Sequence, residues 1–105
     1  MRNMIFTVAL SLVLLANSLA ISAEPTRALI IEGQNNHGIW PKTSKMMKGY
    51  LEQTKLFEVE IIRTIAKGTD PDFKPRFSDY GVVISNYNGA AWPVETQQAF
   101  VEYIR

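Results

Sequence analysis

The chain has 105 residues, a formal net charge of +1 at pH 7 and no cysteine. This length allows one domain at most, and a charge near zero gives no electrostatic reason to expect nucleic acid or an anionic membrane as a partner. The lack of cysteine excludes a disulfide framework, a thiol nucleophile and a thiolate metal site.

Residues 1–23 have the pattern of a secretory signal peptide. Arg2 forms a short positive region, residues 4–16 form an apolar stretch, and small residues allow cleavage after Ala20 or Ala23. The alternative is an uncleaved membrane anchor, because the whole apolar run is about as long as a bilayer-spanning helix. We expect an exported protein, periplasmic or extracellular, with no stable membrane association once the signal peptide is removed.

Residues 27–40, with the sequence RALIIEGQNNHGIW, predict a buried strand that opens into a polar loop. Residues 28–31 form the continuous apolar run that is typical of a parallel strand covered on both faces. We expect the strand to break at Glu32 and Gly33, and the loop over residues 34–40 then carries amides, one imidazole and one indole. A rigid strand followed by such a loop is a common way for α/β proteins to build a ligand site.

Pro41 predicts the start of a helix, with Thr43 or Ser44 as the cap that accepts a bond from a free amide of the first turn. Spacings of three and four predict one apolar stripe, made of Met47, Tyr50, Leu51 and Thr54. The side chains expected to point away from it are Lys45, Lys48, Glu52 and Lys55. Gly49 costs the helix ~1 kcal/mol relative to Ala, so we expect close packing on the sheet there.

Residues 57–62 predict an edge or near-edge strand with one wet face, because Phe57, Val59 and Ile61 alternate with Glu58 and Glu60. Residues 63–80 show no helical period and contain two prolines. We therefore expect a long connection, with Phe73 and Phe77 as its apolar contacts to the rest of the protein.

A third strand is predicted at residues 81–85, which are again continuously apolar. It opens into a second polar loop at residues 86–89. Trp92 and Pro93 then begin a second helix, with proline in its first turn. The inner face of this helix is expected from the spacing of its apolar residues: Val94, Gln97, Phe100, Val101, Tyr103 and Ile104.

The alternation of strands and helices predicts a parallel sheet with right-handed crossovers. In the flavodoxin-like order, the first strand lies between the second and the third. The carboxyl ends of strands one and three then flank the crevice in which such folds bind ligands. The polar loops over residues 34–40 and 86–92 are therefore expected to face each other.

These two loops combine uncharged amides with aromatic rings, a set that suits a small neutral ligand rich in hydroxyl groups, such as a sugar. The residues expected to bind it are Gln34, Asn35, Asn36, Trp40, Asn86, Tyr87, Asn88 and Trp92. The alternative is that the asparagines serve turns with positive φ, and that Trp92 belongs to the core.

His37 is the only histidine, and it is the candidate catalytic acid–base group, a metal ligand or an incidental loop residue. Glu32 or Asp79 are candidate partners, although nothing in the spacing requires them. One imidazole does not make a metal site, because zinc needs at least three protein ligands. A divalent metal cofactor therefore stays open, without support from ligand spacing. The motifs of phosphate-binding loops, dinucleotide sites and serine hydrolases do not occur.

Three stretches carry a family resemblance: LIIEGQNNHGIWPKTS, LFEVEIIRT and GVVISNYNGAAWPVETQQAFVEYIR. Together they make residues 27–105 resemble the start of a ThuA-like protein, a member of the trehalose-utilisation family. The resemblance implies a class I glutamine-amidotransferase-like α/β fold of the flavodoxin-like kind. Family members are more than twice as long, so we expect a truncated N-terminal half of the domain. The nucleophilic cysteine of the amidotransferase relatives has no counterpart here.

The resemblance implies a role in the metabolism of disaccharides or keto-sugars, with a hydrolase or isomerase activity in the full-length parent. His37 is then the acid–base group or a metal ligand, and the asparagines bind hydroxyl groups. One alternative is a non-catalytic sugar-binding accessory module. Another is an inactive fragment, whose unpaired apolar sheet edge would aggregate. The substrate, the reaction and the oligomeric state stay open.

Overall fold

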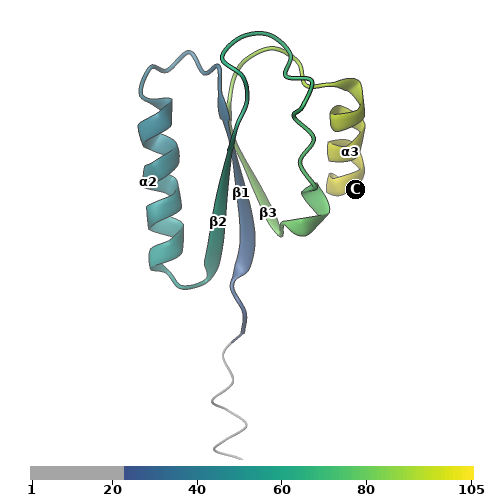
Figure 1. Cartoon of the computed structure of the whole chain (residues 1–105). Coiled ribbons are helices and arrows are strands. Elements are labelled where there is room, and N and C mark those ends of the chain that lie inside the picture. Colours follow the sequence, from purple (N-terminus) through teal and green to yellow (C-terminus); the bar gives the residue numbers. More distant parts are fainter. Residues whose placement is uncertain (1–22) are drawn as a thin grey trace, which may run out of the picture.

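A computed structural model describes residues 23–105, so most of the predicted signal peptide lies outside the described residues. Three parallel strands form its centre, in the order β2-β1-β3 (Figure 1). β1 (Thr26–Gly33) pairs with β2 (Phe57–Arg63) on one side and with β3 (Val82–Tyr87) on the other. The predicted parallel sheet of flavodoxin-like order is confirmed. β1 differs from the prediction in running through Glu32 and Gly33 without a break.

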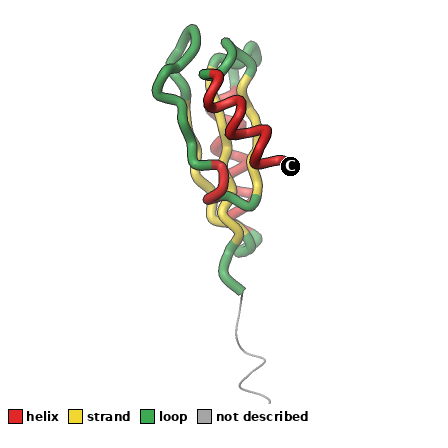
Figure 2. The backbone as a smooth tube through the Cα atoms, turned by 90° about the vertical axis from the view of Figure 1, so that its right-hand side faces the viewer, coloured by secondary structure: helices red, strands yellow, loops and turns green. Residues whose placement is uncertain are grey.

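One helix lies on each face of the sheet, which gives the described structure three layers (Figures 1 and 2). α2 (Trp40–Gln53) packs on one face. α3 (Val94–Ile104) packs on the other, beside the short 3-10 helix η1 (Phe77–Asp79). None of the helices in the described residues has both the length and the apolar character that crossing a membrane requires.

The four central residues of β1 are fully buried, and they supply both halves of the core. Successive side chains of a strand point to opposite faces. Ala28 and Ile30 therefore pack beneath α2, whereas Leu29 and Ile31 pack beneath α3 and the long connection. This two-sided burial explains why the sequence is continuously apolar here.

The long connection between β2 and β3 closes the α3 side of the core with aromatic rings. Phe73 and Phe77 are each 3% exposed and pack against Trp92, as their predicted role as apolar contacts requires. Tyr80 is buried too, and its hydroxyl donates to the carboxylate of Glu60. Burial and this hydrogen bond raise the pKa of Tyr80 to about 12, so the hydroxyl keeps its proton and continues to donate.

α2 begins earlier than predicted, because Trp40 is already its first residue. Ile39 is the N-cap and makes no side-chain capping bond, so the prediction of Thr43 or Ser44 as the cap is wrong. Pro41 lies in the first turn, where its fixed φ suits the helix and its lack of an N–H costs nothing. Thr43 and Ser44 lie further along the helix, and their hydroxyl groups do not cap it.

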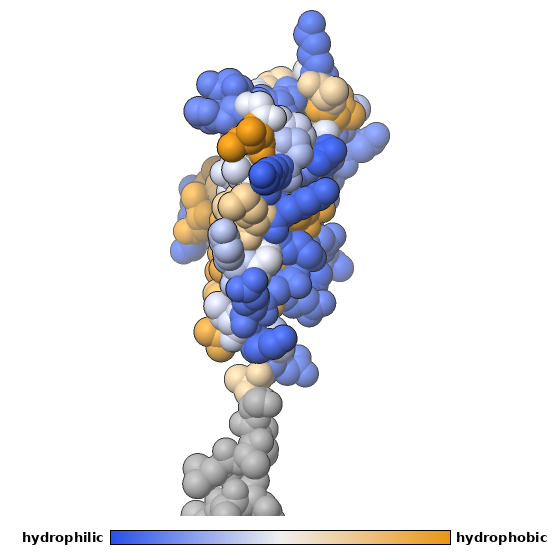
Figure 3. All heavy atoms as spheres, turned by 90° about the vertical axis from the view of Figure 1, so that its left-hand side faces the viewer, coloured by the Kyte–Doolittle hydropathy of each residue, from blue (hydrophilic) through white to orange (hydrophobic). Residues whose placement is uncertain are grey.

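The buried stripe of α2 is narrower than predicted. Met47 and Leu51 pack on the sheet, and Ser44 is fully buried beside them. Tyr50, however, is 61% exposed, and Thr54 lies at the C-cap and is exposed. The outer surface of the molecule on this side is largely hydrophilic, with scattered apolar side chains (Figure 3).

Two further expectations for α2 are wrong. Lys48 does not point away from the sheet: its ammonium donates to the carbonyl oxygen of Val59 at 2.7 Å and pairs with Glu52 at 2.9 Å. Its long apolar stem lets it lie along the sheet while its charge stays partly solvated. Gly49 is not a point of close packing, because a Cβ there would meet nothing within 4 Å.

α3 turns a different face to the core than the spacing predicts. Thr96 is buried, with its hydroxyl donating to the carbonyl oxygen of Phe73 at 2.7 Å, and Phe100 and Tyr103 pack against the core. The large area of the two rings decides the orientation. Pro93 is the N-cap and precedes the first turn. The other predicted inner residues are exposed: Val94, Gln97, Val101 and Ile104.

β3 runs to Tyr87, so Asn86 and Tyr87 lie on the strand and not in the predicted loop. Within the described sheet, β2 and β3 are the two edges. This confirms the prediction that residues 57–62 form an edge strand.

Candidate functional site

The carboxyl ends of the three strands meet at one edge of the sheet, at the top of Figure 1, and the two polar loops lie together there. The side chain of Asn35 donates to the backbone oxygen of Asn86 at 3.4 Å and to its side-chain oxygen at 3.1 Å. Asn88 donates to the side chain of Asn36 at 3.0 Å. The predicted convergence of the two loops is therefore confirmed.

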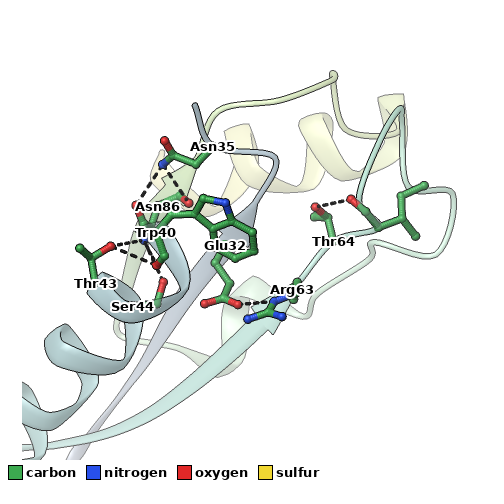
Figure 4. Close-up of polar contacts among 9 residues, drawn as sticks. Glu32, Asn35, Trp40, Thr43, Ser44, Arg63, Thr64 and Asn86 are labelled. Atoms are coloured by element: carbon green, nitrogen blue, oxygen red, sulfur yellow. Dashed lines mark hydrogen bonds and ion pairs between the residues drawn. The ribbon is translucent and has the colours of Figure 1, made fainter. Parts of the chain in front are cut away.

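Asn86 fastens β3 to the first turn of α2 (Figure 4). Its amide nitrogen lies within hydrogen-bond distance of three oxygens: the carbonyl of Trp40 at 3.1 Å and the hydroxyls of Thr43 at 3.1 Å and Ser44 at 2.8 Å. Its side-chain oxygen accepts from Asn35. An amide has two N–H donors and one oxygen, so these contacts use its hydrogen-bonding capacity within the protein.

Gln34 joins three segments of the chain. Its side-chain nitrogen donates to the carbonyl oxygens of Ile65 and Gly68, both at 2.8 Å, and its oxygen accepts from the backbone N–H of Ala90 at 3.0 Å. Gln34 has a φ of 47°, in the left-handed region that few residues with a side chain adopt. The surrounding hydrogen bonds hold this conformation in place. A Cβ at Gly89 would collide with the Gln34 side chain.

The aromatic residues predicted for the second loop, Tyr87 and Trp92, pack inward. Tyr87 donates its hydroxyl to the carbonyl oxygen of Ala90, and burial raises the pKa of Tyr87. Trp92 lies 5.1 Å from Phe73 and 5.6 Å from Phe100 between ring centroids. Its indole nitrogen is buried and bonds to no residue of the described chain. The structure therefore places Trp92 in the core, the alternative that the sequence left open.

An open cleft of about 490 Å³ lies on the other side of the first loop, between the carboxyl ends of β1 and β2. We call it the Trp40 cleft. Its lining residues are Gly33, Gln34, Asn35, Trp40, Arg63, Thr64, Ile65, Ala66 and Lys67. Arg63, Thr64 and Lys67 were missed by sequence reasoning, which treated their stretch as a connection. Their position could have identified them, because they follow directly on the predicted strand over residues 57–62, which lies beside the first strand at its carboxyl end.

Arg63 is held from two sides in this cleft (Figure 4). Its Nε donates to the carboxylate of Glu32, whose side chain is 3% exposed. Its guanidinium carbon lies over the ring of Trp40, 4.9 Å from the centroid. The Arg63 side chain is itself 55% exposed. The head group is therefore oriented by an ion pair and a cation–π contact while it faces the cleft.

Gly33 lets the ends of β1 and β2 approach each other. Its φ is 134°, and a Cβ there would collide with the hydroxyl of Thr64. The backbone N–H of Thr64 donates to the carbonyl oxygen of Glu32 at 3.1 Å. Only glycine combines this backbone conformation with such a close neighbour.

His37 lies on the exposed part of the first loop. Its backbone N–H donates to the side chain of Asn35 at 3.0 Å, and its carbonyl oxygen accepts from Trp40 at 2.9 Å. Its imidazole bonds to no residue of the described chain. Neither of the two predicted partners pairs with the imidazole. The carboxylate of Glu32 pairs with Arg63, and Asp79 lies in η1, which comes before β3 at the amino-terminal end of the strand. Residues 23–105 contain no group of three His, Cys, Asp or Glu side chains that could hold a metal ion.

Replacing Asn86 with Ala tests whether this amide holds α2 on the sheet. Asn86→Ala leaves the buried hydroxyl of Ser44 without its partner and removes the shorter of the two bonds that the Asn35 amide donates, so the free energy of unfolding should fall by about 2 kcal/mol. Urea unfolding followed by circular dichroism measures this. Asn88→Ala is the control, because its bond to Asn36 is exposed and its loss should cost less than ~0.5 kcal/mol. Equal effects of the two substitutions would contradict the role of Asn86.

Among solved structures, the chain is similar to the crystal structure of a protein described as thua-like, from Parabacteroides merdae ATCC 43184. The two are 38% identical in sequence, and they superpose with a TM-score of 0.71. The match covers 76% of this chain and 29% of that one, so this chain spans less than a third of the length of its neighbour. No protein-family model and no curated protein matches the chain.

Proposed function

We propose a sugar-handling role for this chain, which is ThuA-like in both sequence and fold. A ThuA-like protein is one related to trehalose utilisation, and this relation favours a disaccharide or a keto-sugar as the ligand. Because the chain spans 29% of the similar structure, the activity of a whole protein is part of the proposal.

The proposed binding place is the Trp40 cleft. Hydrogen bonds cross the crevice between the loops after β1 and β3: Asn35 and Asn88 donate across it, and Gln34 accepts from Ala90. These bonds occupy amides that the sequence assigned to the sugar. The cleft is open instead, and its volume of about 490 Å³ lies within the range of about 300–1,000 Å³ for small-molecule sites. The single observation that carries the proposal is this open cleft at the carboxyl ends of two parallel strands.

Recognition of the sugar in this cleft depends on Trp40 and Arg63. An indole offers an apolar face to the C–H groups of a sugar ring. Arg63 lies over one face of Trp40, so the ligand contacts the remaining indole surface and the arginine beside it. The guanidinium donors of Arg63 that face the cleft then bond to hydroxyl groups.

Trp40→Ala tests the place of binding. Isothermal titration of the folded chain with trehalose and with a keto-disaccharide should give binding that the substitution weakens about tenfold or more, a loss of ~1.4 kcal/mol. Tyr50→Ala is the matched control, since Tyr50 is an exposed aromatic residue of the same helix outside the cleft. The Tyr50→Ala variant should bind the sugars with the affinity of the wild type. Sugar binding that survives Trp40→Ala unchanged would place the ligand elsewhere.

The catalytic form of the proposal assigns the acid–base role to His37, which lies in the loop between the lining residues Asn35 and Trp40 without lining the cleft itself. His37→Gln should then abolish product formation from the bound sugar and leave the melting temperature unchanged, because the side chain makes no bond within the described residues. Product analysis by chromatography provides the measurement. Binding without any product from the wild-type chain favours the non-catalytic accessory module instead, in which a sugar raises the melting temperature and is released unaltered.

We also infer that the protein is exported, because its N-terminus has the pattern of a cleaved leader. The intact mass of the protein recovered outside the cytoplasm should correspond to a chain that begins at Ile21 or at Glu24, according to whether cleavage follows Ala20 or Ala23. A chain that retains Met1 and stays with the membrane fraction would support the uncleaved anchor instead.

A further inference from the structure

We propose that the Trp40 cleft binds a sugar that carries a carboxylate, and that Arg63 and Lys67 together recognise this group. The inference rests on the proposed function, since the sugar is the same ligand, and it adds the charge that the ligand bears. It replaces the expectation of a neutral sugar, which depended on amides that bond within the protein.

Arg63 is prepared for a planar anion. Its Nε edge is occupied by the buried carboxylate of Glu32, and its face lies on the ring of Trp40. The two terminal nitrogens make no hydrogen bond to the described residues, and the side chain is about half exposed at 55%. A guanidinium fixed in this way presents two parallel N–H donors, the arrangement that a carboxylate accepts in a bidentate pair. Holding the arginine in advance lowers the entropy lost on binding.

Lys67 supplies a second positive charge to the same cleft. It lines the cleft wall opposite α2 and forms no ion pair with any residue of the described chain. No acidic residue lines the cleft itself. Asp70 and Asp72 are the acidic residues of the adjoining loop, and the Asp70 carboxylate accepts from the backbone N–H groups of Ile65 and Asp72. A ligand anion therefore meets two cationic groups in the cleft and no lining carboxylate that repels it.

The balance of charge favours a carboxylate over a phosphate. Arg63 and Lys67 carry two positive charges, and the buried Glu32 compensates one of them. One positive charge remains, which a single carboxylate neutralises. A phosphate monoester carries about −1.5 to −2 at pH 7 and would leave negative charge in the cleft.

A matched pair of ligands tests the inference. Glucuronate and glucose share the same ring and differ in a carboxylate at the sixth carbon, so their dissociation constants on the full chain isolate the effect of the charge. We expect glucuronate to bind about tenfold more tightly in dilute buffer, with a preference that shrinks as the salt concentration rises. Trehalose serves as the neutral disaccharide and glucose 6-phosphate as the phosphorylated ligand.

The outcomes separate this inference from the proposed function. Binding of glucose or trehalose without a preference for glucuronate overturns the carboxylate and leaves the sugar site in place. Tighter binding of glucose 6-phosphate than of glucuronate overturns the choice of anion. If none of the four ligands binds to the folded chain, both the inference and the sugar site are overturned.

Substitutions of the cleft cations test whether Arg63 and Lys67 bind the carboxylate of the ligand. Lys67→Gln should reduce the preference for glucuronate about threefold or more, whereas Lys45→Gln, at an exposed lysine of α2 outside the cleft, should leave it unchanged. Arg63→Lys keeps a positive charge beside Glu32 and removes the planar fork, so the preference should fall while the melting temperature is kept. Unchanged preference in both cleft variants would overturn the assignment.

A second variant at Arg63 keeps the inference testable if Arg63→Lys does not fold. Where circular dichroism shows that Arg63→Lys does not fold, because lysine fails to hold the buried Glu32 carboxylate, a second variant takes its place. The double substitution Glu32→Gln with Arg63→Gln then removes both charges together and leaves no unpaired buried ion. Loss of the glucuronate preference in this folded double variant supports the inference, and retention of the preference overturns it.

Discussion

The complete burial of β1 is the constraint on which the rest of the structure depends. Residues 28–31 have no exposed surface, so both faces of the strand need a cover and both edges need a partner. α2 covers one face, α3 and the aromatic connection cover the other, and β2 and β3 pair along the edges. A parallel arrangement then brings the carboxyl ends of all three strands to one edge. The cleft and the two polar loops lie at this edge because they are built from the residues that follow the carboxyl ends of these strands.

The hydrogen bonds between the two loops decide which side of β1 is open to a ligand. Asn35, Asn86 and Gln34 connect the loop after β1 to β3 and to the loop that follows it, and so they close the crevice between β1 and β3. On the side of β2, the same Gln34 side chain bonds the carbonyl oxygens of Ile65 and Gly68 and so fixes the segment that forms one wall of the cleft. These amides therefore close the crevice between β1 and β3 and form part of the wall of the cleft between β1 and β2. For this reason the candidate site is the Trp40 cleft and not the crevice that the sequence predicts.

The sequence predicts the strands, their order and the anchoring role of Phe73 and Phe77, because these depend on apolar periodicity and on chain connectivity. It does not predict which face α3 buries, since Val94 and Ile104 fit the helical period as well as Phe100 does, and the aromatic partners that select Phe100 come from a distant segment. Nor does it predict how Asn86 is used. An amide that binds a ligand and an amide that binds Ser44 look the same in a sequence, and only the tertiary arrangement distinguishes them.

The two walls of the Trp40 cleft differ in how firmly they are held. Trp40 is the first residue of α2, and its carbonyl oxygen is bonded by Asn86, so its ring is part of a helix that is fastened to the sheet. The opposite wall is a loop, and the side chain of Gln34 bonds the carbonyl oxygens of its residues Ile65 and Gly68. The reach of the Gln34 side chain thus helps to set the distance between the two walls, together with the bonds of Thr64 to Glu32 and of Ile65 to Asp70, and with it the size of ligand that the cleft admits.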